Sequence, residues 1–194
     1  MILAIVADDG PAVAAMLGAA PALATARVEE GATRAQARDH YFSEIEHYVY
    51  GGDTALHVAA AAYREPVVRV LIECGADIAA QNRRGAQPLH YAADGAPGSR
   101  NWNPAAQQET VATLLAAGAD PNVTDKSGVA PLHRAVRTRC SAAVAALLAG
   151  GADPLLPNKS GSTPLELARR TTGRGGSGSP EAKAEQEAIV RLLA

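Results

Sequence analysis

The chain is poor in aromatic residues and cysteine, and it contains no long hydrophobic run. Aromatic residues make up 4% of its 194 residues, so a core has to be built mainly from Ala, Val and Leu. The apolar N-terminal segment 1–7 is far shorter than the roughly 20 residues that a membrane-spanning helix needs, and it lacks the basic start of a signal peptide. We therefore expect a cytoplasmic protein that does not enter a membrane.

The chain also lacks an excess of charge of either sign. Its formal net charge is −2 at pH 7 and its isoelectric point is near 6.2. These totals give no overall electrostatic attraction to nucleic acid or to an anionic membrane surface. They remain compatible with a local concentration of charge on one face.

One short motif recurs along the chain at a nearly constant interval. Residues 53–57 (Asp-Thr-Ala-Leu-His) have counterparts at 87–90 (Gln-Pro-Leu-His), 130–133 (Ala-Pro-Leu-His) and 163–166 (Thr-Pro-Leu-Glu). The leucines of these motifs are 33, 43 and 33 residues apart, so the middle interval is one period of 33 with ten inserted residues. A period near 33 is typical of stacked supersecondary units rather than of one closed globular core.

Each unit contains the signals of a turn followed by two helices. Gly85 suits a turn with positive φ, Pro88 suits the first position of a helix, and Gly118 is expected to end the second helix as a left-handed cap. At the last helix start, Thr163 and Glu166 are spaced for a capping box.

The helix starts at Gln87 and Ala130 lack the threonine found at Thr54 and Thr163. Losing such a cap costs about 1 kcal/mol. We therefore expect these two repeats to be held less well at that point.

Residues 125–136 (Asp-Lys-Ser-Gly-Val-Ala-Pro-Leu-His-Arg-Ala-Val), with 147–153 (Leu-Leu-Ala-Gly-Gly-Ala-Asp), form the most complete unit. This pattern resembles the ankyrin repeat, and the resemblance extends over residues 49–194. It implies an all-α solenoid of stacked helix–turn–helix units with β-turn fingers and atypical capping repeats at both ends.

We expect one solenoid domain divided into five segments. These are N-terminal capping helices with an aromatic plug (1–48), a repeat (49–81), a repeat with an insertion at 95–104 (82–124), a repeat (125–157), and a C-terminal repeat with a glycine-rich insertion at 172–180 (158–194). The aromatic segment 40–50 holds three of the five tyrosines and the only phenylalanine. We interpret it as a plug that closes the N-terminal end of the stack; the alternative is an aromatic cluster that grips a ligand.

His57, His90 and His133 occupy the same position in successive repeats. Because neighbouring helices pack about 8–10 Å apart, these side chains are too widely separated to share a zinc ion. The resemblance implies a structural role instead, as hydrogen-bonding groups that join neighbouring turns.

In the ankyrin family, partners contact the fingertips and the exposed end of each first helix. Carried over by motif position, this surface holds only two acidic residues, Asp53 and Asp94, and Arg134 adds a charge where the family usually has an apolar residue. Its basic residues are Arg83, Arg84, Lys126, Arg137, Lys159 and Arg170. Two interpretations remain open: these charges only solvate exposed turns, or they form a basic concave stripe that attracts an acidic partner.

Both insertions fall between the two helices of a repeat, so we expect them to leave the same edge of the stack. Ten residues reach about 33 Å, which would let the loops meet over the turn of the intervening repeat. The expected patch contains Trp102, Arg100, Arg139, Cys140 and Arg174. A tryptophan beside arginine is typical of an interface hot spot; the alternative is that Trp102 packs on a helix edge and shields the core.

Catalytic signals are sparse. Cys140 is the candidate nucleophile, because Arg137 and Arg139 could lower its thiol pKa, but no base is near it in sequence. Cys74 and Cys140 fall at different points of repeats two apart, so we expect reduced thiols. The glycine-rich insertion is interpreted as a flexible linker, or alternatively as an anion-holding helix start. We expect a non-catalytic protein without a cofactor or a bound metal.

These observations predict a scaffold that binds another protein through its basic concave face and the edge carrying Trp102. The charge favours a partner with an acidic or phosphorylated segment. Nucleic acid, a membrane and a small-molecule substrate are not expected as partners. The alternative is binding of a small anion, a nucleotide or nucleic acid by Arg137, Arg139, Arg174 and the glycine-rich loop.

Overall fold

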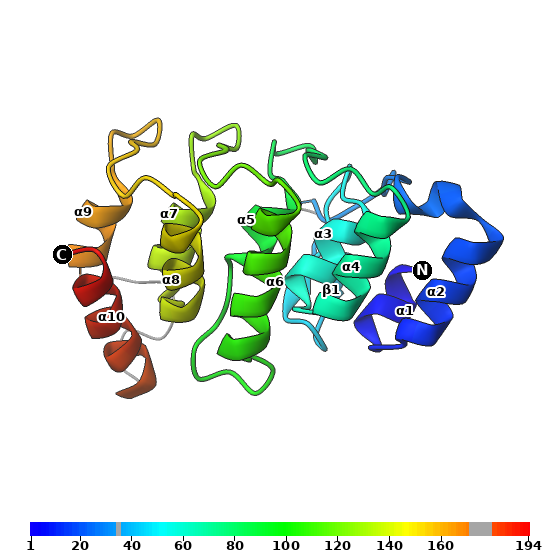
Figure 1. Cartoon of the computed structure of the whole chain (residues 1–194), viewed down its shortest axis with the longest axis horizontal. Helices are drawn as coiled ribbons and strands as arrows, with labels where there is room; N and C mark the ends of the chain where they lie inside the picture. The colour runs from blue at the N-terminus through cyan, green and yellow to red at the C-terminus, as the bar shows by residue number, and fades with distance from the viewer. Residues whose placement is uncertain (34–35, 171–179) are drawn as a thin grey trace.

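The computed structural model describes residues 1–33, 36–170 and 180–194 of the chain. Helices stand in pairs along one axis, with the N-terminus at one end of the row and the C-terminus at the other (Figure 1). The loops that connect successive pairs project to the same side of the row (Figure 1). This arrangement confirms the predicted all-α solenoid.

The helices of the row fall into two layers, because each first helix packs on the next first helix and each second helix on the next second helix. The first helices are α1 (Ile2–Val6), α3 (Ala55–Ala61), α5 (Pro88–Ala92), α7 (Pro131–Thr138) and α9 (Pro164–Arg169). The second helices are α2 (Gly10–Ala19), α4 (Glu65–Glu73), α6 (Pro104–Ala116), α8 (Ser141–Ala149) and α10 (Pro180–Leu192). Short 3-10 turns at Pro21–Ala24 and Arg38–His40 lie between α2 and the hairpin described below.

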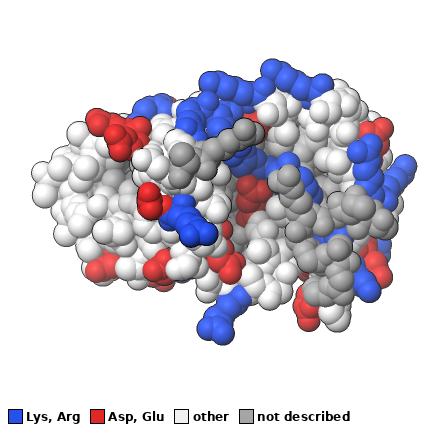
Figure 2. All heavy atoms as spheres, turned by 180° about the vertical axis from the view of Figure 1, so that it is seen from behind, with Lys and Arg blue, Asp and Glu red and all other residues white. Residues whose placement is uncertain are grey.

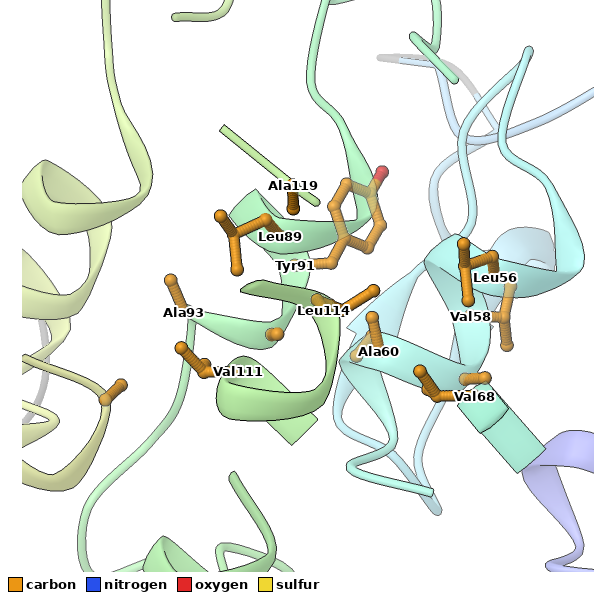
Figure 3. Packing of buried hydrophobic residues seen from close by; sticks show 14 of the residues in the cluster. Leu56, Val58, Ala60, Val68, Leu89, Tyr91, Ala93, Val111, Leu114 and Ala119 are labelled. Carbon is orange, nitrogen blue, oxygen red and sulfur yellow. The ribbon is translucent and has the colours of Figure 1, made fainter. Parts of the chain in front are cut away.

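The core is built from small aliphatic side chains, as the composition requires. The motif leucines Leu56, Leu89 and Leu132 are fully buried, and burying each contributes about 2 kcal/mol. Figure 3 shows Val111 and Leu114 of α6 next to buried residues of α5. Alanines at the remaining contact positions let the helices approach closely, so neighbouring pairs share one continuous core.

The three motif histidines join each repeat to the next. The Nδ1 atoms of His57, His90 and His133 each accept a hydrogen bond of 3.1 Å from the backbone N–H at the start of their own helix. The Nε2 atoms donate to backbone carbonyl oxygens of the following repeat, at 3.0 Å to Ala86, 2.9 Å to Val129 and 3.1 Å to Ser162. The predicted structural role of these residues is confirmed.

The same histidine bonds satisfy one backbone group at each of these helix starts. The backbone N–H groups of Gln87 and Ala130 are satisfied by the histidine three residues later. At the last helix start, Glu166 takes this place and forms the predicted capping box with Thr163, at 3.0 and 3.2 Å. The histidine bond occurs at Thr54 as well as at Gln87 and Ala130. It therefore does not replace a threonine cap, and a weaker start at the Gln87 and Ala130 repeats stays a prediction.

The fingers are linked to one another through their backbones. Arg83 N–H donates to the Gly51 carbonyl at 3.0 Å, Lys126 N–H to the Arg84 carbonyl at 3.0 Å, and Lys159 N–H to the Ser127 carbonyl at 3.2 Å. Gly85 has a φ of 76°, and a Cβ there would lie 3.0 Å from the backbone nitrogen of Lys126. Glycine is therefore needed for the turn and for the close approach of the next finger.

The aromatic segment does not close the end of the stack, so that prediction is wrong. It forms a hairpin of β1 (Tyr41–Phe42) and β2 (His47–Tyr48), paired in antiparallel register. The His47 ring lies 4.5 Å from the ring of Tyr91 in α5, and α1 and α2 form the end layer instead. The hairpin therefore covers part of the first-helix layer in the middle of the row.

Candidate partner-binding surface

The basic fingertip residues are exposed, and their charges converge on one edge. Arg83, Arg84, Lys126 and Lys159 all carry exposed side chains, and none of them takes part in an ion pair within the described ranges. Seen from behind, Lys and Arg gather along the upper edge, the side to which the fingers project (Figure 2). Arg137 and Arg170, at the ends of α7 and α9, are also exposed.

Tyr50 orders the first pair of these arginines. The Arg84 guanidinium carbon lies 4.9 Å from the centre of the Tyr50 ring, and that of Arg83 lies 5.6 Å from it. Arg83 also donates to the backbone carbonyl of Ala32. Cation–π contacts of this kind contribute about 0.5–1 kcal/mol at exposed sites, so the two side chains are held over the first finger.

A cavity of about 130 Å³ lies beside these residues, and we call it the arginine pocket. Arg84 from a finger and Arg137 from α7 both line it, although they come from different repeats. The complete lining is His47, Tyr50, Asn82, Arg84, Ala86, Tyr91, Asp94, Arg134 and Arg137. Three of the residues predicted from sequence to contact a partner thus meet at one point.

Of Arg84, Arg134 and Arg137, only Arg134 is largely buried. Its side chain is 11% exposed and pairs with Asp94 at 2.9 Å and Asp125 at 3.3 Å. Burial opposes its charge, but the two carboxylates raise the pKa of its guanidinium above the ordinary value. Arg134 therefore links two repeats internally and neutralises Asp94, rather than offering its charge to a partner.

Asp53 is also internal, although its motif position predicted an exposed fingertip. Its carboxylate is fully buried and accepts hydrogen bonds from the Tyr50 N–H, the Asn82 amide and the Tyr91 hydroxyl at 2.7–2.9 Å. Both acidic positions expected on the binding face are therefore engaged within the molecule. The exposed part of this face is more basic than the residue count predicts.

The predicted patch at the insertion edge does not form among the described residues. Arg139 and Cys140 are buried, and Arg174 lies outside the described ranges. Burial raises the pKa of the Cys140 thiol to about 12, so the idea of an activated nucleophile flanked by arginines is wrong. Arg100 is exposed.

Trp102 is half-buried against the start of α6. Its Nε1–H donates to the side-chain oxygen of Gln107 at 3.0 Å. Gly95, at the base of the same insertion, has no room for a side chain: a Cβ would lie 2.6 Å from Cys140 Sγ and 2.9 Å from the Tyr63 hydroxyl. The insertion is therefore packed onto the helices, in line with the interpretation that Trp102 shields the core.

A second cavity, of about 250 Å³, lies between the insertion and the hairpin, and we call it the aromatic pocket. Tyr48, Tyr50, Tyr63 and Trp102 are among the residues that line it. Asn101 joins its two rims by donating to the Ser43 carbonyl at 3.1 Å. The sequence indicated an aromatic cluster in segment 40–50 as the alternative to a plug, but it did not indicate that Tyr63 and Trp102 complete the walls.

The described part of the chain contains two cysteines, but no metal-binding cluster and no membrane-spanning helix. Within it, no group of three or more His, Cys, Asp or Glu residues is placed to hold a metal ion, and no helix has the length and apolarity to cross a bilayer. Cys74 is exposed, Cys140 is buried, and both are free cysteines.

Sequence models of ankyrin repeats match three overlapping or adjacent stretches of the chain: residues 13–101 (three copies), 84–126 (one repeat) and 114–168 (many copies). The chain belongs to the ankyrin-repeat family. Ankyrin repeats generally mediate protein–protein interaction, so protein partners are the general expectation for this member.

A shorter similarity connects this ankyrin-repeat chain to curated proteins. Over 44 residues it is 54% identical to the tRNA endonuclease ANKZF1 of Homo sapiens and to that of Bos taurus. The match covers 23% of this chain and 6% of each relative. The similarity is thus confined to less than a quarter of this chain and to a small part of those proteins.

Proposed function

We propose that this ankyrin-repeat protein is a non-catalytic scaffold that binds an acidic or phosphorylated segment of another protein through its basic face. We define the basic face as Arg83, Arg84, Lys126, Arg137, Lys159 and Arg170. The observation that supports it best is the arginine pocket, where Arg84 and Arg137 of neighbouring repeats line one small cavity.

The charge balance at this pocket favours an anion. Asp94, the acidic residue of the lining, is paired with Arg134, so the charges of Arg84 and Arg137 are left uncompensated there. His47, which also lines the cavity, has its pKa lowered by burial and is neutral at pH 7. A cavity of about 130 Å³ suits a carboxylate or phosphate group better than a whole peptide.

The rest of the basic face extends this interaction along the row of fingers. Lys126 and Lys159 continue the line of positive charge beyond Arg84, in a chain whose net charge is −2. Such a local field raises the association rate with an acidic partner. The exposed Arg100 at the insertion edge would add a second contact. A cytoplasmic location is part of the proposal, because the unpaired Cys74 and Cys140 suit a reducing compartment.

The alternative of nucleotide or nucleic-acid binding by Arg137, Arg139 and Arg174 has less support. Arg139 is buried, and neither Arg174 nor most of the glycine-rich insertion is within the described residues. The tRNA endonuclease activity named for the relatives is not carried over, because the similarity covers 6% of their length.

The proposal is tested with a library of peptides that carry phosphoserine or runs of glutamate, and neutral counterparts, measured by fluorescence anisotropy. Reversing both charges in Arg84→Glu/Arg137→Glu should weaken binding of the selected acidic peptides at least tenfold, equivalent to about 1.4 kcal/mol. The matched control is Arg191→Glu, because Arg191 is exposed on α10 and does not line the pocket. Equal binding by all three proteins, or no preference for acidic over neutral peptides, would refute the proposal.

A further inference from the structure

The aromatic pocket is a formed cavity that the proposed function does not use. Its walls come from the hairpin, α3, the insertion and the end of α7. The Asn101–Ser43 hydrogen bond closes the insertion onto the hairpin, and Gly95 lets the insertion lie directly on Tyr63. The pocket is therefore held by contacts between distant parts of the chain.

The aromatic walls offer ring surfaces rather than hydrogen-bond donors. The Tyr63 hydroxyl donates to the Asp94 carbonyl, and the Trp102 Nε1–H donates to Gln107. Because both polar groups are used inside the molecule, a ligand would meet the electron-rich rings of these residues. Tyr48 and Tyr50 add two more rings from the hairpin side.

The charged residues that line this pocket are acidic, in contrast to those of the arginine pocket. They are Glu46 and Asp94, and no lysine or arginine is among the lining residues. Glu46 is exposed at the hairpin turn and takes part in no ion pair within the described ranges. Aromatic rings combined with a carboxylate are the environment that attracts an ammonium group, through cation–π and Coulomb interactions.

We propose that the aromatic pocket binds an alkylammonium group, namely a lysine side chain of the protein partner. The pocket's preference for a cation stands on its own lining, whereas the origin of that lysine in the partner rests on the proposed function. The two pockets share His47, Tyr50 and Asp94 in their walls. A partner segment would therefore place its lysine next to the acidic or phosphorylated residue that enters the arginine pocket.

The intrinsic fluorescence of Trp102 gives a direct readout, because Trp102 is the only tryptophan of the chain and lines the pocket. The full chain is titrated with Nα-acetyl-lysine methylamide and with Nα-acetyl-norleucine methylamide, which has a similar apolar stem without the charge. The chemical shifts of the Gly95 amide and of the Trp102 indole N–H are followed alongside the fluorescence. The lysine probe should give a saturable change with a dissociation constant at least fivefold lower than that of the norleucine probe.

Two variants locate the effect. Glu46→Gln should weaken the lysine probe about threefold or more, whereas the control Glu73→Gln, which alters an exposed glutamate at the end of α4, should not. Equal affinities for the lysine and norleucine probes, an unchanged affinity in Glu46→Gln, or no saturable change in either signal would each overturn the proposal.

The test also separates this inference from the proposed function. The Arg84→Glu/Arg137→Glu variant should no longer bind the acidic peptides but should still bind the lysine probe. If wild type binds the lysine probe but no acidic peptide, the aromatic pocket stands and the proposed function fails.

Discussion

His90 of one repeat and Val129 of the next are joined by a 2.9 Å hydrogen bond from the imidazole Nε2 to the backbone carbonyl. The other ring nitrogen accepts from the Gln87 N–H, so this arrangement requires a neutral imidazole. Burial, helped by the nearby charge of Arg134, lowers the pKa of His90 to about 4. Burial also lowers the pKa of His57 and His133. The stack is thus held together by groups that must stay uncharged.

This relationship predicts that the free energy of unfolding falls in mild acid. The unfolded chain binds protons on these histidines below about pH 6.5, while folded His90 does not until about pH 4. Stability should therefore be constant above pH 7 and decrease as the pH falls from about 6.5 toward 4, with His90 alone accounting for about 3 kcal/mol. Urea unfolding at pH 7.5, 6 and 5 measures this, and His90→Gln should show a smaller pH dependence. Equal stability at pH 7.5 and 5 would contradict the prediction.

Replacing Arg134 by alanine should lower the free energy of unfolding much more than replacing Arg137 by alanine. Arg134→Ala leaves the carboxylates of Asp94 and Asp125 without their partner, and breaking a buried ion pair costs about 3 kcal/mol. Arg137→Ala removes an exposed side chain and should change stability by about 0.5 kcal/mol or less. Chemical denaturation of the two variants makes the comparison. A similar decrease in the free energy of unfolding in both variants would show that Arg134 has no special structural role.

Gly95→Ala should loosen the insertion. The added Cβ would meet Cys140 Sγ and the Tyr63 hydroxyl at less than 3 Å, and such overpacking costs about 1–3 kcal/mol. The emission of the neighbouring Trp102 should shift to longer wavelength as the loop moves outward. The control is Gly18→Ala in α2, where nothing lies within 4 Å of the new Cβ; there the higher helix propensity of alanine should stabilise the protein slightly. A Gly95→Ala protein as stable as wild type would show that the insertion is not packed as described.

The two cysteines should react at different rates. Cys74 is exposed and Cys140 is buried, with a thiol pKa raised to about 12. Iodoacetamide at pH 7.5 should therefore modify Cys74 in the native protein and both residues in urea. Peptide mass spectrometry identifies the sites. Modification of Cys140 before Cys74 would contradict the buried position and would reopen thiol chemistry as a function.

The repeat architecture was predictable because it is encoded locally. The motif leucines mark the period, and the histidines carry a role that depends only on the neighbouring repeat. Gly118 likewise ends α6 in the predicted way, with a φ of 100° and the Ala119 N–H donating to the Leu114 carbonyl at 3.0 Å. Signals that span one helix or one turn are the ones a sequence reveals.

The candidate site was predictable only in part, because it depends on contacts between distant segments. Arg134 was expected to be exposed, but Asp94, 40 residues earlier in the preceding repeat, withdraws it from the surface. The hairpin was placed at the wrong position for the same reason: its location follows from the stacking of His47 on Tyr91, 44 residues later. No repeat motif includes the hairpin, so no periodic pattern could indicate where it packs.

The most direct test of the basic face as the binding surface is a map of amide chemical-shift changes in the full chain on addition of an acidic peptide selected from the library. The largest changes are expected at Arg84, Lys126 and Arg137, which come from two neighbouring repeats, and Arg84→Glu/Arg137→Glu should abolish them. Changes concentrated on the second helices α4, α6 and α8, with the fingers unaffected, would contradict it.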